Sequence, residues 1–165
     1  MHPTKSAWLR DQLNLCEGKL LRYAQSLLGD LTHAQDMVQE SFLRLAQQEP
    51  FDPTLPWLLR VCRNLITDHF RKDKHMVDAT LDQRIHPAPS PLDQLETQDI
   101  TQRLMRLVHR LPATQREIVR LKFQEGLSYK EIGEITGLTA NHVGVLLHQA
   151  MTALRKKMST LEVRT

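Results

Sequence analysis

Apolar residues recur along this chain at steps of three and four residues, and this spacing restricts the fold more than any other feature of the sequence. In the first run, one helical face comprises Leu9, Leu13, Cys16, Leu20, Ala24 and Leu27. A second run comprises Ala34, Val38, Phe42 and Leu45. A third helix is expected from about Pro56 to Lys72. No stretch alternates apolar and polar residues as a half-buried strand does. The sequence therefore predicts an all-α protein.

The breaks between these helices also carry recognisable signals. The segment "EPFDPTLP", residues 49–56, holds three prolines in eight residues and is expected to be a loop. Three further sites show the capping-box pattern, in which serine or threonine precedes glutamine or glutamate by three positions at a helix start. These predicted boxes are Thr32 with Gln35, Thr114 with Glu117, and Ser128 with Glu131. Gly137 suits the left-handed residue that ends a helix, and Thr139 is expected to cap the last helix.

Residues 73–98 separate the chain into two parts. They lack sustained periodicity, include "PAPSP", and carry five acidic and two basic side chains. We expect a hydrated, flexible linker there. A second domain begins near Asp99, and its first helix is indicated by the spacing of Ile100, Leu104, Leu107, Val108 and Leu111. The predicted architecture is two small helical domains, residues 1–72 and 99–165, joined by this linker.

Composition and charge exclude several classes of protein. No apolar run approaches the roughly 18 residues of a membrane span, and the start "MHPTKSAWLRDQ" lacks a signal peptide, so we expect a cytoplasmic protein. Cys16 and Cys62 stand alone on apolar faces and are expected to be reduced core thiols. His142 and His148 are six residues apart, so they do not form a metal-binding pair on one face, and no metal or cofactor site is predicted. Residues 99–165 carry eleven basic and six acidic side chains, which suits a polyanionic partner.

The third predicted helix presents cationic and amide side chains opposite its apolar stripe. This face comprises Arg60, Arg63, Asn64, Thr67 and Arg71, with no acidic residue among them. Such cations can follow a phosphate backbone, and the amide and guanidinium groups can bond to exposed base edges. Trp57, at the helix start, could stack on an unpaired base or pack into the core. For the arginines, an ordinary solvated face is the alternative.

The second predicted helix has an acidic outer face instead. Asp36, Glu40 and Leu43 share it, with Gln39 alongside. Acidic residues near a helix start complement its dipole, which is one explanation. The other is a docking surface for a protein partner, because acid there would not help DNA binding.

A helix-turn-helix is predicted from "GLSYKEIGEITGLTANHVGVLLHQAMTALRKK", residues 126–157. Its internal face comprises Ile132, Ile135, Leu138, Val143, Leu147, Ala150 and Leu154. The early residues of the second helix in such a unit reach bases in the major groove, and here they are Thr139, Ala140, Asn141, His142 and Val145. The first helix supplies Ser128, Tyr129 and Lys130 for the DNA backbone.

Three motifs in order resemble the extracytoplasmic-function sigma factors of bacterial RNA polymerase. "AQDMVQESFLRL" resembles the family's segment that docks on the polymerase clamp helices, and "PWLLRVCRNLITDHFRK" resembles its promoter-melting and minus-ten-reading helix. Residues 110–157 resemble region four, which reads the minus-thirty-five element. The resemblance implies that polymerase docking involves Asp36, Gln39, Glu40, Phe42 and Leu43. It implies that the loop from Gln47 to Leu55, with Asn64 and its basic neighbours, captures a flipped base. It places Gln149 among the minus-thirty-five contacts, and it implies core polymerase (clamp helices and flap), promoter DNA and an anti-sigma factor as partners.

The last helix departs from the family, which usually carries basic residues where this chain has Gly144, Leu146, Gln149 and Met151. Val145 and Leu146 therefore form part of a protein-binding patch or pack against the domain's first helix.

The principal functional prediction is a promoter-specificity factor without catalytic activity. The alternative is a stand-alone helix-turn-helix regulator of duplex DNA, which would leave the arginines of the third helix without a role. An enzyme ranks last, because the sequence has no phosphate loop or metal-ligand cluster.

Overall fold

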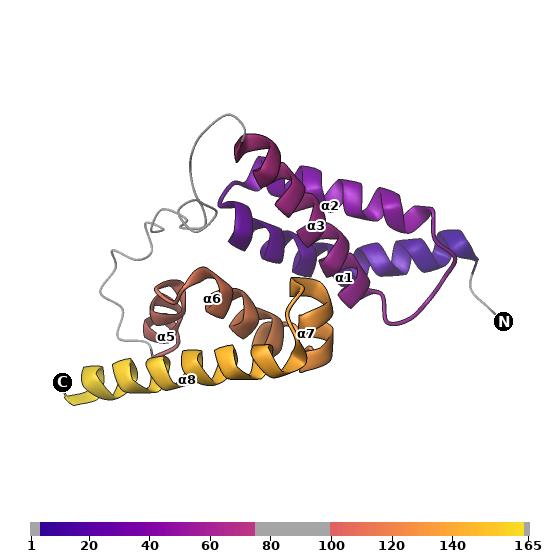
Figure 1. Ribbon diagram of the computed structural model, residues 1–165. Coiled ribbons are helices and arrows are strands. Elements are labelled where there is room, and N and C mark those ends of the chain that lie inside the picture. The colour runs from indigo at the N-terminus through magenta and orange to yellow at the C-terminus, as the bar shows by residue number, and fades with distance from the viewer. Residues whose placement is uncertain (1–3, 75–99, 164–165) are drawn as a thin grey trace. The chain divides into compact units, whose positions relative to one another are not determined.

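The computed structural model of the chain describes residues 4–74 and 100–163 (Figure 1). All regular elements in these two ranges are helical, and neither range contains a strand, which confirms the predicted all-α class. The chain divides into two compact units, Met1–Pro87 and Ala88–Thr165. Most of the predicted linker lies outside the described residues. Asp73 and Lys74, which were assigned to that linker, are instead the last residues of a helix.

The N-terminal unit consists of α1 (Lys5–Leu28), α2 (Leu31–Ala46) and α3 (Leu55–Lys74), which pack side by side (Figure 1). Its core comprises Trp8, Cys16, Leu20, Tyr23, Ala24, Leu27, Ala34, Val38, Phe42, Leu45, Leu58, Leu59, Cys62, Ile66 and Phe70. Both cysteines are free and buried, as predicted. Burial raises the pKa of the Cys62 thiol to about 12. Leu9 and Leu13, which were assigned to the core face, are only half-buried.

The start of α2 differs from the prediction. The predicted box of Thr32 and Gln35 is wrong, because Asp30 is the capping residue. Gly29 takes the left-handed conformation that ends α1, with φ 71°, and Asp30 is already extended at φ −133°. The helix therefore begins at Leu31, and the backbone N–H of Thr32 donates to Asp30 Oδ1 at 3.0 Å. Threonine at 32 lies inside the first turn and cannot act as the cap.

The C-terminal unit packs three short helices against one long helix. Figure 1 shows α5 (Ile100–His109), α6 (Ala113–Val119) and α7 (Tyr129–Thr136) along α8 (Ala140–Val163). A π-helical turn, Arg120–Gln124, continues α6. The core comprises Leu107, Val108, Leu111, Ile118, Val119, Leu121, Leu127, Ile132, Ile135, Val143, Leu147, Ala150 and Leu154. The predicted first helix of this unit is confirmed as α5, in which Ile100 and Leu104 are 66% and 38% exposed while Leu107 and Val108 are buried.

Of the two capping boxes predicted in this unit, the first is wrong and the second is confirmed. The box of Thr114 and Glu117 is wrong: α6 begins directly after Pro112, so Thr114 already has a helical backbone, and no side chain caps the helix. The box of Ser128 and Glu131 is confirmed, with the Glu131 N–H donating to Ser128 Oγ at 3.1 Å and the Ser128 N–H donating to Glu131 Oε2 at 3.0 Å. Both pairs match the same sequence pattern. Only Ser128 has the extended backbone of a residue that precedes a helix, so only this pair forms the box.

The turn between α7 and α8 has the geometry predicted for a helix-turn-helix. Gly137 is left-handed at φ 80°, and the His142 N–H donates to Thr139 Oγ1 at 3.1 Å, which confirms both predicted caps. Within the described ranges, no helix combines the length and apolar character needed to cross a membrane.

Candidate functional site

The cationic face of α3 lies opposite the buried stripe of that helix. Arg60, Asn64 and Arg71 are exposed, and Arg63 and Thr67 are half-buried. The Thr67 hydroxyl donates to the Arg63 carbonyl at 2.9 Å, so it is directed toward the helix backbone. Arg60, Asn64 and Arg71 therefore present two guanidinium groups and one amide on the exposed side of the helix.

An acidic residue, Asp68, lies beside this face without being one of its five residues. Arg71 Nη1 is 3.8 Å from Asp68 Oδ1, and both side chains are mostly exposed. An exposed pair of this kind contributes about 0–1 kcal/mol. Arg71 can therefore exchange this partner for a phosphate at little cost.

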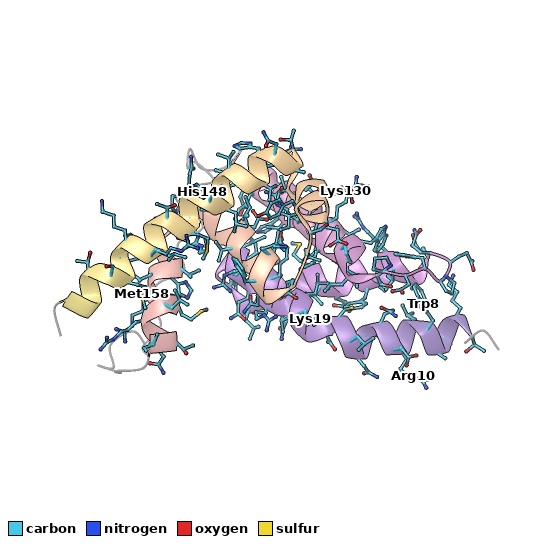
Figure 2. All side chains as sticks on the ribbon, turned by 90° about the horizontal axis from the view of Figure 1, so that it is seen from below. Trp8, Arg10, Lys19, Lys130, His148 and Met158 are labelled. Carbon is cyan, nitrogen blue, oxygen red and sulfur yellow. The ribbon has the colours of Figure 1, made fainter. Side chains whose placement is uncertain are left out.

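Trp57 has packing partners on one side. Its ring centroid is 5.6 Å from that of Phe51 in an edge-on arrangement, and Phe51 is 5.9 Å from Trp8. This aromatic row connects α1, the proline-rich loop and α3. Figure 2 shows Trp8 on the side of α1 turned toward the rest of the unit and Arg10 on the opposite side. Thr54, which is buried, donates its hydroxyl to the Phe51 carbonyl at 3.0 Å and further fixes the loop. Trp57 is thus half-buried, so part of its surface is accessible.

The acidic face of α2 borders an apolar groove. Asp36 and Gln39 are exposed, Glu40 is half-buried, and Leu43 is 56% exposed. Phe42 is buried, as its place on the inward face of α2 predicted, and it forms part of the groove wall. The groove, of about 490 Å³, lies between α1 and α2 and is lined by Leu9, Leu13, Glu17, Leu21, Gln35, Val38, Gln39, Phe42, Leu43 and Ala46.

The sequence prediction missed the contribution of α1 to this surface. Leu9, Leu13 and Leu21 line the groove and are half-buried. These leucines follow one another at steps of four and eight residues and lie beside the core residues of α1. The resulting widening of the apolar face was the sequence signal that could have indicated the groove. Glu40 accepts a hydrogen bond from Arg44 Nε at 3.2 Å, so a cation sits next to the predicted acidic face.

A histidine pair connects the start of α2 with the end of α3. His33 Nδ1 pairs with Asp30, and this hydrogen bond raises the pKa of His33 and lowers the pKa of Asp30. The His33 ring centroid is 5.1 Å from that of His69, whose Nε2 is 3.6 Å from Asp73 Oδ2. In the described part of the chain, no group of three or more histidine, cysteine or acidic residues is placed to hold a metal ion.

The helix-turn-helix brings part of its predicted reading face together. A shallow hollow of about 400 Å³ is lined by Tyr129, Ala140, Asn141, Gly144, Val145, His148 and Gln149. Five of these residues were predicted as DNA contacts. The others predicted, which comprise Ser128, Lys130, Thr139 and His142, are exposed but do not line the hollow. His148 was missed, although it follows Asn141 by seven residues and therefore shares its helix face.

Val145 and Leu146 differ in environment. Val145 is 47% exposed and lines the hollow, whereas Leu146 is half-buried and does not. The two residues therefore do not form one continuous patch on this hollow.

A second apolar groove lies elsewhere on the C-terminal unit and was not predicted. It measures about 430 Å³ and is lined by Leu104, Met105, Val108, Val119, Arg120, Phe123, Gln124, Met151 and Leu154. Phe123 belongs to the π-helical turn and is 61% exposed. No sequence signal distinguished it from a core phenylalanine, because a π-helical turn changes which side chains point inward.

Comparison with known proteins adds independent findings. The family model for Sigma-70 region 2 matches residues 14–76, and the model for Sigma-70, region 4 matches residues 101–154. The chain is 31% identical over 151 residues to the ECF RNA polymerase sigma factor SigL of Mycobacterium tuberculosis, covering 87% of this chain and 85% of that relative. It is 28% identical over 153 residues to RfaY of Xanthomonas campestris, named a probable RNA polymerase sigma factor, but spans only 38% of the length of RfaY while 87% of this chain is covered.

The fold is similar to that of a solved sigma factor. The crystal structure of RpoE, in complex with the anti-sigma factor NepR from Bartonella quintana, matches with a TM-score of 0.65 at 22% identity. The match covers 91% of this chain and 96% of RpoE.

Proposed function

Because the chain belongs to the extracytoplasmic-function family of RNA polymerase sigma factors, we propose that its two units divide the work of promoter recognition. The N-terminal unit binds core polymerase and helps to open the promoter near the start site. The C-terminal unit binds the minus-thirty-five element. A stand-alone regulator is not favoured, since it would leave the match to Sigma-70 region 2 without a role.

The observation that carries this proposal is the α3 face, which combines exposed arginines with an exposed amide within the segment that matches Sigma-70 region 2. Arg60 and Arg71 attract the phosphates of the separated strand, and Asn64 bonds to a base edge. Arg63 and Thr67 support the same surface. The loop before α3, with the exposed part of Trp57, accepts an unstacked base.

Core polymerase docks on the acidic face of α2. Asp36, Gln39 and Glu40 offer polar contacts to the clamp helices, and Leu43 supplies an apolar contact at the rim of the groove between α1 and α2. Phe42 acts as part of the groove wall. An exposed leucine beside an apolar groove is the kind of site where a partner side chain loses water on binding.

The C-terminal unit carries the upstream contacts. Asn141, Val145 and Gln149 face the bases, together with Thr139, Ala140 and His142 at the start of α8. Ser128, Tyr129 and Lys130 lie at the start of α7 and approach the DNA backbone. The groove that contains Phe123 suits a second apolar contact, and the polymerase flap is its proposed occupant. An anti-sigma factor that covers the docking faces would prevent polymerase binding, and one that covers the reading face of α8 would prevent promoter binding.

The chain itself carries out no catalytic step under this proposal and needs no cofactor, because polymerase supplies the chemistry of RNA synthesis. It acts in the cytoplasm, where polymerase and promoter DNA are present.

Transcription in vitro with purified core polymerase on genomic fragments tests the function. We expect discrete start sites that depend on this protein and share two upstream motifs. Arg60→Ala and Asn64→Ala should reduce open-complex formation, measured by permanganate reactivity of unpaired thymines. Arg10→Ala, an exposed arginine on the opposite side of α1 from Trp8 (Figure 2), is the matched control. Failure to stimulate any start would contradict the proposal.

Core binding is tested separately. Leu43→Arg should weaken binding to core polymerase, measured by competition with a labelled wild-type chain. Leu15→Arg is the control, because Leu15 is also an exposed leucine, at 65%, but does not line the groove. Equal affinities of the two variants would exclude the proposed docking face.

A further inference from the structure

An aromatic ring from α7, that of Tyr129, lies against α8 at Gly144 in the hollow of the helix-turn-helix. A Cβ built on Gly144 would lie 3.4 Å from Cε2 and 3.7 Å from Cδ2 of Tyr129. A methyl group would therefore only touch the ring, whereas a longer side chain at 144 needs the space that the ring fills. Gly144 thus allows the Tyr129 ring to lie against α8.

The Tyr129 ring is also held from a second side. Lys122 Nζ, in the π-helical turn, lies 5.2 Å from the ring centroid. The same ammonium group donates a hydrogen bond to the Leu127 carbonyl at 3.2 Å, which restricts its motion. A cation over the face of an aromatic ring attracts it electrostatically. Two independent contacts therefore fix the orientation of a side chain that is 42% exposed.

The hollow beside this ring has apolar and polar parts. Ala140, Val145, Gly144 and the ring of Tyr129 supply apolar surface, and the amides and imidazole of Asn141, Gln149 and His148 supply polar groups. Figure 2 shows His148 on α8 and Lys130 on the neighbouring α7. None of the seven lining side chains is a lysine or arginine, so the hollow is not built for a phosphate.

Duplex DNA offers one group that matches this lining. In the major groove, the 5-methyl of thymine is an apolar group, and asparagine or glutamine can bond to the adenine N6 and N7 of an A·T pair. We propose that Tyr129, positioned by Gly144 and Lys122, forms the wall of a thymine-methyl pocket on α8 and makes the minus-thirty-five reading specific for an A·T pair at one position. This inference rests on the proposed function and adds the base preference and the residues that create it.

The test replaces thymine by deoxyuridine, one position at a time, through the minus-thirty-five element of a promoter found by start-site mapping. The replacement removes only the methyl group. With holoenzyme assembled from core polymerase and the full chain, we expect one position at which the affinity falls about fourfold, the equivalent of one buried methyl group. No such position, in a promoter that the holoenzyme transcribes, overturns the inference and leaves the proposed function intact.

Variants locate the pocket on the protein. Tyr129→Phe and Gly144→Ala keep the ring in place and should retain the thymine-to-uracil difference. Tyr129→Ala and Gly144→Leu remove or displace the ring and should abolish that difference. Circular dichroism melting checks that each variant folds, and the uracil scan on the wild-type chain needs no variant. A difference that persists in both Tyr129→Ala and Gly144→Leu overturns the assignment, and a promoter element that needs no A·T pair does so as well. The absence of any start site that depends on the wild-type chain would instead defeat the proposed function itself.

Discussion

Replacement of Gly133 by alanine should destabilise the C-terminal unit, although the same change in an ordinary helix would stabilise it. Gly133 lies inside α7, is buried, and faces the turn that leads into α8. A Cβ at this position would lie 2.6 Å from the carbonyl oxygen of Leu138. That oxygen belongs to the backbone and cannot rotate away as the end of a side chain could. The turn and α7 would therefore have to move apart.

The size of the effect follows from two opposing contributions. Alanine has a higher helix propensity than glycine by about 1 kcal/mol. Forced overpacking of a tight contact costs about 1–3 kcal/mol, and a backbone neighbour places this site at the upper end. The Gly133 carbonyl also accepts the Gly137 N–H at 2.8 Å, so a shift of α7 disturbs its end as well. We expect a net loss of about 2 kcal/mol.

Gly144→Ala is the matched control. The added Cβ would meet only the edge of the Tyr129 ring at 3.4 Å. The gain in helix propensity should then dominate, with a stabilisation of up to about 1 kcal/mol. The two glycine-to-alanine changes, in adjacent helices of one unit, should have opposite signs.

Thermal unfolding of the full chain measures the stability changes of both the Gly133→Ala and the Gly144→Ala variants. A change of 1 kcal/mol shifts the melting temperature of a small domain by about 4–8 °C, so Gly133→Ala should lower that of the C-terminal unit by about 8–16 °C. Both tryptophans, Trp8 and Trp57, lie in the N-terminal unit, so their fluorescence follows that unit while circular dichroism follows both. A Gly133→Ala variant that melts at or above the wild-type temperature would refute the reasoning.

Three other predictions concern local structure. With a pKa of about 12 and full burial, the Cys62 thiol should react with a thiol reagent at pH 8 only after unfolding, in a colorimetric assay with and without urea. Because the folded pKa of His33 is raised, its stabilising contribution is complete below its unfolded value of about 6.5 and is lost as pH rises through the folded value. The urea midpoint from tryptophan fluorescence should fall over that range, and a His33→Gln variant should show a smaller fall. Ser128→Ala removes the cap of α7 and should destabilise the C-terminal unit by about 1 kcal/mol, whereas Ser159→Ala, exposed within α8, should have little effect in the same melts.

Helix periodicity predicted most of the fold, because the burial of a helix face depends on spacing that is written in the sequence. The apolar stripe of α3, with Leu58, Cys62, Ile66 and Phe70, is buried as expected. The predicted ends at Gly137 and Thr139 were also correct, because each depends on one residue type and its immediate backbone. The predicted caps at residues 32 and 114 were wrong, since a capping pattern does not fix the residue at which the helical backbone begins.

The candidate sites were also predicted only where they lie on a single helix, because residue spacing describes one helix at a time. Spacing on a single helix identified the outward face of α3 and the start of α8. It could not identify surfaces made by two elements, such as the groove to which α1 contributes Leu9 and Leu13, or the second groove around Phe123. The sequence showed Gly144 only as a departure from the family's usual basic residue, because the ring that lies against it comes from a residue fifteen positions earlier in the chain.

Residue spacing was enough to predict the helical class, the helix-turn-helix, the cationic face of α3 and the acidic face of α2, because each is a periodic property of a continuous segment. Which of those side chains meet residues from another helix became visible only in the folded chain. Packing placed Tyr129 over Gly144 and exposed Phe123 on a π-helical turn. These outcomes depend on distances between segments, and spacing along one segment does not contain them.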